Sequence, residues 1–257
     1  MSPMGLWIGF TTLLCKEIRR FTRIWLQTLL PPVITTTLYF LIFGNLIGPR
    51  IGEMEGYRYM DFIVPGLIIM AVITNSYANV SSSFFSARFQ RFVEEMMVSP
   101  MPPWVMLIGY TCGGLARGMV VGVVVTVVSL FFSQLQIHNL GVVLSVVVLT
   151  SILFSLAGFS NGLFARNFDD ISIIPIFVLT PLTYLGGVFY SIRLLPEFWQ
   201  ALSLANPILY MINAFRYGFL GISDISLPLS YAMIVGFILI LFGVNLALLN
   251  RGYRMRS

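Results

Sequence analysis

The residues best suited to binding a partner lie in one short segment, RFVEEMMVSPMPPW, at residues 91–104. Its charged side chains could orient a polar partner, and its apolar side chains, methionines among them, could supply an adaptable contact surface. The prolines that follow end a helix, because proline lacks the N–H donor and disfavours helix just before it. The segment therefore predicts a short docking helix. The predicted contact residues are Arg91, Phe92, Glu94, Glu95, Met96 and Met97. The alternative is a solvated loop whose acids balance the nearby arginines.

The remaining residue types give little support for a catalytic function. The single lysine, Lys16, does not follow a glycine-rich turn, so the sequence has no P-loop for ATP. The single histidine, His138, falls in a predicted loop, which argues against a metal site or a histidine-based triad. We therefore expect no catalytic residue, no metal and no cofactor in this chain.

The composition predicts an all-α integral membrane protein. Of the 257 residues, 58% are hydrophobic and 10% are charged, whereas a soluble domain carries about 25% charged residues. Apolar stretches of membrane-spanning length recur, without the alternation of a β-barrel. The net charge of +5 comes from basic residues that flank these stretches, so it predicts orientation in a lipid bilayer and not a nucleic-acid partner.

A single transmembrane domain over residues 1–257 accounts for the whole chain. The predicted spans are residues 26–47, 62–85, 105–132, 140–165, 171–190 and 228–249. The docking segment, residues 88–103, then connects spans 2 and 3. Between spans 5 and 6, residues 191–224 are apolar but broken by prolines and charges. Their pieces are too short for full crossings and predict re-entrant or interfacial helices.

Before the first span, residues 5–23 predict a basic amphipathic helix in the membrane surface. Apolar residues recur every three or four positions, so they share one helical face. The basic residues on the other face are Lys16, Arg19, Arg20 and Arg23. The alternative is a short, distorted first span, which the clustered charges disfavour.

The distribution of basic residues predicts the orientation, because basic residues accumulate on the cytoplasmic side. With the N-terminus inside, ten basic residues are cytoplasmic: Lys16, Arg19, Arg20, Arg23, Arg88, Arg91, Arg166, Arg251, Arg254 and Arg256. Four are outside: Arg50, Arg58, Arg193 and Arg216. Both termini and the docking segment are therefore predicted to be cytoplasmic, and residues 191–224 are predicted to be outside.

Spans 1, 2 and 5 combine internal prolines with clustered polar residues, and two interpretations remain open. Bent helices with hydroxyl and amide groups suit a transport path, but the same residues also serve ordinary helix packing. The candidate path residues are Thr35, Thr36, Asn75, Asn79 and Thr183.

Arg117 is the one charge well inside a predicted span, and it also has two interpretations. It could face a pathway, or its side chain could snorkel to the cytoplasmic interface. Snorkelling is favoured, because only residues 118–132 beyond it are continuously apolar. The acids all fall in loops or at span ends, which weakens a proton- or sodium-driven transporter.

The order of these elements resembles the membrane (permease) subunit of type-2 ABC exporters, in the bacterial group near nodulation-type lipo-oligosaccharide and drug exporters. The segments that carry the resemblance are LTPLTYLGGVFYSIRLLPEFWQ at 179–200, NPILYMINAFRYGFLG at 206–221, FIVPGLIIM at 62–70 and RFVEEMMVSPMP at 91–102.

The resemblance implies a homodimer of permeases in the bacterial inner membrane, with a separate ATPase subunit that binds ATP and magnesium. It implies that spans 1, 2 and 5 line the path between the permeases, and that the segment after span 2 is the coupling helix. It also implies an outer structure that includes Gly186, Gly187, Asn206, Pro207, Arg216 and Gly221. The implied function is export of a lipid-linked, glycan or amphipathic substrate. The alternatives are a stand-alone secondary transporter and a membrane scaffold for a cytoplasmic partner.

Overall fold

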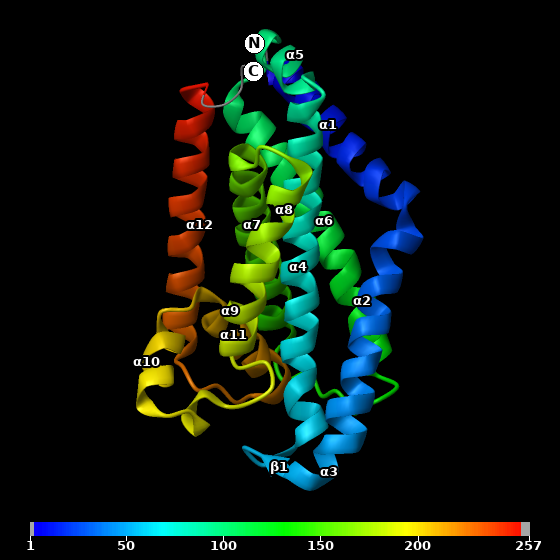
Figure 1. Cartoon of the computed structure of the whole chain (residues 1–257), viewed down its shortest axis with the longest axis vertical. Coiled ribbons are helices and arrows are strands. Elements are labelled where there is room, and N and C mark those ends of the chain that lie inside the picture. The colour runs from blue at the N-terminus through cyan, green and yellow to red at the C-terminus, as the bar shows by residue number, and fades with distance from the viewer. Residues whose placement is uncertain (1–2, 253–257) are drawn as a thin grey trace.

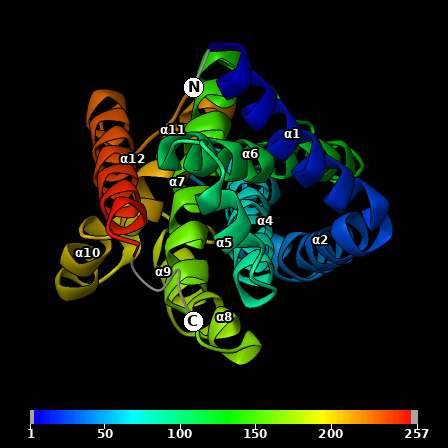
Figure 2. The same ribbon diagram turned by 90° about the horizontal axis from the view of Figure 1, so that it is seen from above.

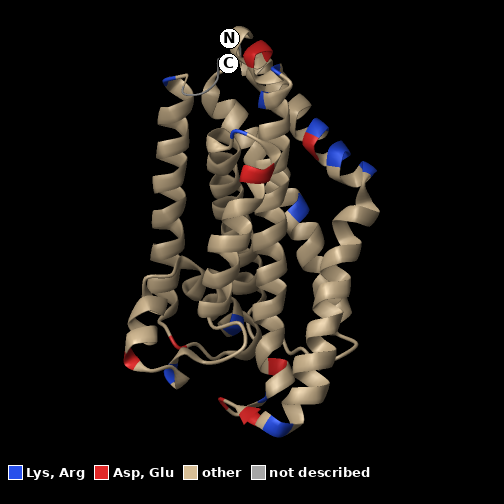
Figure 3. Ribbon diagram, viewed as in Figure 1, with Lys and Arg blue, Asp and Glu red and all other residues tan. Residues whose placement is uncertain are grey.

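Long apolar helices that run side by side make up most of the structure, a computed structural model that describes residues 3–252 (Figure 1). Arg254 and Arg256, which entered the charge count, lie outside the described residues. Lysine, arginine, aspartate and glutamate gather mainly toward the two ends of the bundle, with few charges between them (Figure 3). This distribution is the one that an apolar membrane interior requires.

Within residues 3–252, six helical segments are long and apolar enough to cross a membrane, which confirms the predicted all-α membrane fold. They are Trp25–Ile51, Tyr59–Phe89, Pro103–Ser129, Leu140–Phe164, Phe168–Leu185 and Leu227–Asn250. Span 5 ends five residues before its predicted end at 190. The reason is Gly187, whose φ of 79° is accessible to glycine but strained for other residues.

The spans differ in regularity. Span 1 consists of α2 (Trp25–Tyr39), the π-helical η1 (Phe40–Ile47) and α3 (Gly48–Ile51). Span 5 consists of α8 (Phe168–Ile174), the π-helical η2 (Pro175–Leu179) and α9 (Thr180–Leu185). Spans 2, 3, 4 and 6 are the unbroken helices α4 (Tyr59–Phe89), α6 (Pro103–Ser129), α7 (Leu140–Phe164) and α12 (Leu227–Asn250). Prolines lie inside α2 and open η2 and α9, and removing an amide donor loosens the helical ladder there.

Helix α4 is the centre of the bundle. It packs mainly against α7 and α6, and it lies between α7 and α2 when seen from above (Figure 2). Most of its side chains are buried, including Asn75, Ser76 and Asn79 among the apolar residues, and Thr74 on its least buried side is exposed. Glycines of the neighbouring helices let α4 approach closely.

The closest approach of such a glycine to the backbone of α4 predicts a sharp loss of stability for Gly158→Ala. A Cβ at position 158 would lie 2.4 Å from the backbone oxygen of Tyr77, which cannot move without shifting α4. Overpacking of this kind costs about 1–3 kcal/mol, so we expect the midpoint of thermal unfolding in detergent to fall by about 5 °C. Gly236→Ala is the control, because nothing lies within 4 Å of a Cβ there. Equal midpoints for the two variants would contradict this account of the α4–α7 contact.

Short elements occupy the two ends of the bundle. Helices α1 (Pro3–Arg23) and α5 (Phe92–Val98) lie at the end where α12 finishes (Figure 1). The other end carries an antiparallel hairpin of β1 (Glu53–Met54) and β2 (Tyr57–Arg58), paired Glu53 to Arg58. Residues after span 5 form η3 (Ile192–Leu194), α10 (Glu197–Leu204) and α11 (Pro207–Leu220), which start and finish at this same end.

Candidate functional site

A cavity of about 260 Å³ opens between α2, α4 and α6. We call it the α2–α4–α6 cavity. Its polar lining residues are Gln27, Thr28, Thr35, Thr36, Tyr39, Thr74, Asn75 and Arg117. Its apolar lining residues are Pro31, Pro32, Leu67, Met70 and Ala71. Three of the five candidate path residues, Thr35, Thr36 and Asn75, therefore meet at one cavity.

The prolines of α2 contribute to the polarity of this cavity. Pro31 and Pro32 carry no amide hydrogen, so the carbonyl groups of Gln27 and Thr28 lose their α-helical donors. Both of these residues line the cavity. The proline pair therefore places carbonyl acceptors beside the hydroxyl and amide side chains.

The other two candidate path residues do not line this cavity. Asn79 is fully buried, and its side-chain oxygen accepts a hydrogen bond of 2.7 Å from Arg20 of α1. Thr183 is buried in α9, where its hydroxyl donates to the carbonyl of Leu179 at 2.6 Å. Proline-bearing spans share a composition, but their polar residues point in different directions.

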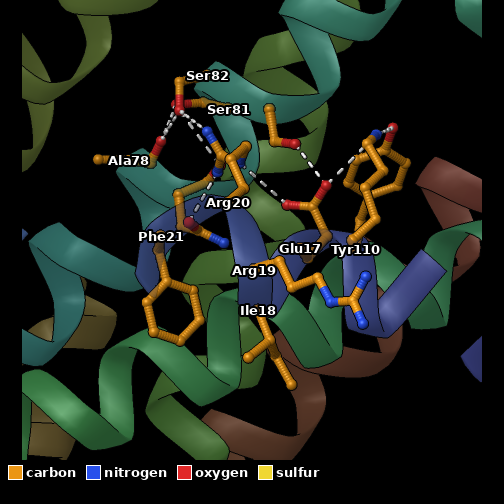
Figure 4. Close-up of polar contacts among 12 residues, drawn as sticks. Glu17, Ile18, Arg19, Arg20, Phe21, Ala78, Ser81, Ser82 and Tyr110 are labelled. Atoms are coloured by element: carbon orange, nitrogen blue, oxygen red, sulfur yellow. Dashed lines mark hydrogen bonds and ion pairs between the residues drawn. The ribbon is translucent and has the colours of Figure 1, made fainter. Parts of the chain in front are cut away.

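Helix α1 is fastened to the bundle by a buried polar network (Figure 4). The carboxylate of Glu17 is fully buried, accepts a hydrogen bond of 2.6 Å from Ser83, and lies 3.6 Å from Lys16 and 3.5 Å from Arg20. Arg20 also donates to the backbone and side-chain oxygens of Asn79, each at 2.7 Å.

The basic face of α1 is therefore divided between the bundle and the surroundings. Arg20 points toward α4, and Lys16 reaches Tyr110 of α6 with its side chain still 49% exposed, whereas Arg19 and Arg23 are exposed and make neither contact. The sequence placed all four on a single outward face. The division arises because α4 offers Asn79 and Ser82 as acceptors under α1.

Arg117 lines the α2–α4–α6 cavity. It lies near the middle of α6, 14 positions after Pro103 and 12 before Ser129. Its guanidinium donates to the side-chain oxygen of Asn75 at 3.1 Å. The structure thus favours the interpretation that the sequence ranked second.

Two asparagines one turn apart on α4 thus accept hydrogen bonds from arginines of two other helices. Arg20 of α1 binds Asn79, and Arg117 of α6 binds Asn75. The spacing of four residues between the asparagines was visible in the sequence as a shared helical face. The sequence analysis missed Arg20 as the partner of Asn79, because the two residues lie 59 positions apart along the chain.

The predicted docking segment contains helix α5, which has one face packed on the bundle and one exposed face. Val93 is fully buried and Met96 partly so, and both pack on the bundle. Phe92, Glu95 and Met97 are exposed, as is Arg91 at the helix start, and Glu94 is half-buried. Of the six predicted contact residues, Met96 is therefore mainly an anchor, because the helix needs one apolar face to stay on the bundle.

The residues implied for the outer structure hold α11 against span 5. The side-chain oxygen of Asn206 caps α11 by accepting from the amide of Ile208 at 3.0 Å, and its amide group donates to Leu182 at 2.6 Å. Pro207 occupies the first turn, as expected for a residue without an amide donor. Gly221 ends α11 in the left-handed conformation, with a φ of 73°. A side chain on Gly186 would meet Ile208 at 3.0 Å.

Arg216 is a buried residue that links α11 to the end of span 5 and to α4. It is 2% exposed, donates to the carbonyl of Gly187 at 2.6 Å, and lies 3.9 Å from the ring centroid of Phe62. Arg193 pairs with Asp224 at 3.1 Å and with Glu55 of the hairpin at 3.9 Å. The sequence analysis missed this link between the hairpin and the outer segment.

Within residues 3–252, no three of histidine, cysteine, aspartate and glutamate gather closely enough to hold a metal ion. The described part of the cavity therefore offers hydrogen bonds and one positive charge as its binding chemistry.

Comparison with known proteins adds three findings. The sequence profile of the family described as "ABC-2 type transporter" matches residues 9–220. The "Inner membrane transport permease YadH" of Escherichia coli K12 is 59% identical over 251 residues, which is 98% of each chain, and the Shigella flexneri protein of the same name gives the same values. "Nodulation protein J" of Rhizobium leguminosarum bv. viciae is 22% identical over 227 residues, 88% of each chain.

Proposed function

The chain belongs to the ABC-2 type transporter family and is a membrane-spanning permease subunit of an ABC transporter, and we propose that it exports a lipid-linked, glycan or amphipathic substrate. Membership implies an ATP-binding partner. In our proposal a separate chain binds ATP and magnesium and hydrolyses the ATP, and this chain contributes no catalytic residue and no cofactor. Two copies of the permease form the path between them.

The observation that carries the proposal is the α2–α4–α6 cavity, a recess that brings polar side chains together among otherwise apolar spans. A path for a substrate with a polar head needs hydrogen-bonding groups at such a depth. A secondary transporter would need a titratable acid there, and the described lining contains none. A scaffold for a cytoplasmic partner would not need the cavity.

Orientation and the coupling contact are part of the same proposal. The six apolar helices and the inner-membrane relative support a multi-pass protein of the inner membrane. We place both termini and α5 in the cytoplasm, so that the exposed side chains of α5 meet the ATP-binding subunit. The hairpin, α10 and α11 then lie outside and shape the exit.

Co-purification with an ATP-binding subunit tests the function. The tagged permease, co-expressed with its ATP-binding partner and reconstituted in proteoliposomes, should retain that ATPase and raise its hydrolysis rate several-fold. A catalytically dead ATPase is the matched control and should abolish transport without dissociating the complex. Transport driven by an ion gradient without ATP would contradict the proposal, and so would a complex that hydrolyses ATP but moves no amphipathic, glycan or lipid-linked substrate.

A further inference from the structure

Arg117 is a positive charge in the middle of a membrane-spanning helix without a carboxylate partner among the described residues. Its one hydrogen bond in the structure is to neutral Asn75, and its Nε is buried without a hydrogen-bond partner. A charge removed from water is costly unless it is paired. The fold therefore retains at Arg117 a charge that the described residues do not neutralise.

The nearest charged network does not supply the missing counterion. Glu17 lies between Lys16 and Arg20, at 3.6 Å and 3.5 Å, and so is already shared by two cations. Glu17 packs on α6 at Gly113, one turn before Arg117. The network beside the cavity therefore carries more positive than negative charge.

A second copy of the chain would not neutralise Arg117 either. The acids of the described residues lie in α1, the hairpin, α5, α10 and one loop, or in the first turn of α4 and α8. A symmetric partner brings the same residues to the interface. Of these acids only Glu17 packs near the level of Arg117 on α6, and it is fully buried and shared by two cations of its own chain. The counterion must come from a ligand.

The cavity is built for the head of an amphiphile. Around Arg117 it presents the side-chain amide of Gln27 and the hydroxyl groups of Thr35 and Thr36, with Leu67 and Met70 as an apolar wall. Guanidinium groups bind phosphate and carboxylate in a planar, two-pronged geometry. Its volume of about 260 Å³ suits a headgroup, with an attached apolar chain extending into the bilayer.

We propose that the α2–α4–α6 cavity binds the anionic headgroup of an amphiphile, a phosphate or carboxylate, with Arg117 as its counterion. The inference rests on the proposed function for the statement that this cavity belongs to the substrate path. Two sources share this chemistry: the transported molecule itself and an anionic phospholipid of the surrounding membrane.

Thermal unfolding of the purified full-length permease in neutral detergent tests binding. The added probes are phosphatidylglycerol, dodecyl phosphate, phosphatidylcholine and inorganic phosphate. We expect the two anionic amphiphiles to raise the midpoint by about 5 °C at a large excess over their dissociation constants. Phosphatidylcholine and inorganic phosphate should have little effect.

Three variants separate an anion site from a structural arginine. Arg117→Gln should keep the unliganded midpoint and lose the rise, Arg117→Lys should keep part of it, and Arg23→Gln on the exposed face of α1 should behave as wild type. An equal rise in all variants would overturn the proposal. So would a lower midpoint of Arg117→Gln in phosphatidylcholine, or an equal rise with inorganic phosphate alone.

The source of the anion is decided in the assembled complex. In phosphatidylcholine proteoliposomes, a substrate should stimulate ATP hydrolysis through Arg117, so dodecyl phosphate should raise the rate in wild type and not in Arg117→Gln. Binding without stimulation supports an anion site filled by membrane phospholipid and overturns its assignment to the substrate. Absence of any ATPase in the complex refutes the proposed function, while the binding measurements on the isolated permease still stand.

Discussion

Reversing both acids of α5, Glu94→Lys together with Glu95→Lys, is expected to lower recovery of the ATP-binding subunit with the permease by more than tenfold. The exposed face of α5 combines Glu95 with apolar Phe92 and Met97, and this mixture of charged and apolar contact residues is typical of a docking surface. Placing like charges opposite a partner's cations costs several kcal/mol, and about 1.4 kcal/mol already corresponds to tenfold. Recovery is measured by affinity purification through the permease.

The matched control for this reversal is Glu197→Lys. Glu197 is exposed and lies in the first turn of α10, so its reversal loses the same kind of interaction with a helix N-terminus that each of the two glutamates of α5 makes. It lies at the opposite end of the bundle, where we place no ATPase. The thermal midpoint should be similar for both proteins. If the α5 variant transports normally and retains its ATPase, these glutamates are not the coupling contact.

Arg216→Ala is expected to lower the thermal midpoint of the permease by about 6–12 °C. The change removes a charged hydrogen bond to Gly187, of about 1.5–3 kcal/mol, and a desolvated contact with the ring of Phe62, of about 2 kcal/mol. It also empties a site that is 2% exposed. Relief from burying the charge offsets part of this, and about 3 kcal/mol of net loss remains.

Two further variants show whether the effect belongs to Arg216 itself. Arg193→Ala removes a cation whose side chain is 64% exposed, so its ion pairs with Asp224 and Glu55 should contribute less than about 1 kcal/mol. Arg216→Met keeps most of the volume and should recover the packing part of the loss. A midpoint of Arg216→Ala equal to that of Arg193→Ala would show that Arg216 does not hold the outer structure.

Local chemistry made several elements predictable from the sequence. An apolar stretch of about 20 residues has few options other than a membrane span, so the number and order of spans followed directly. Pro207 and Gly221 sit at the beginning and end of α11, as their backbone preferences require. The helix at α5 ends before Pro100 for the same local reason.

Partners that are distant in sequence were not predictable in the same way. Periodicity identifies the buried side of a helix only when the other side is polar, but most of α4 is buried and its buried positions mix Asn75, Ser76 and Asn79 with apolar residues. Its pattern therefore has no preferred direction. Which asparagine faces the cavity and which faces α1 depends on where α1 and α6 cross α4.

The sequence by itself determined that this chain is a six-span membrane protein with a charged segment after span 2 and a broken segment before the last span, because spans, caps and helix ends depend on neighbouring residues. Only the tertiary structure decided that Glu17 is buried, that Arg20 points inward and that Arg117 faces a cavity. In the sequence, the arginines of α1 and the arginine of α6 are simply basic residues beside apolar ones. Their difference comes from Asn79 and Asn75, which reach them only when the three helices pack together.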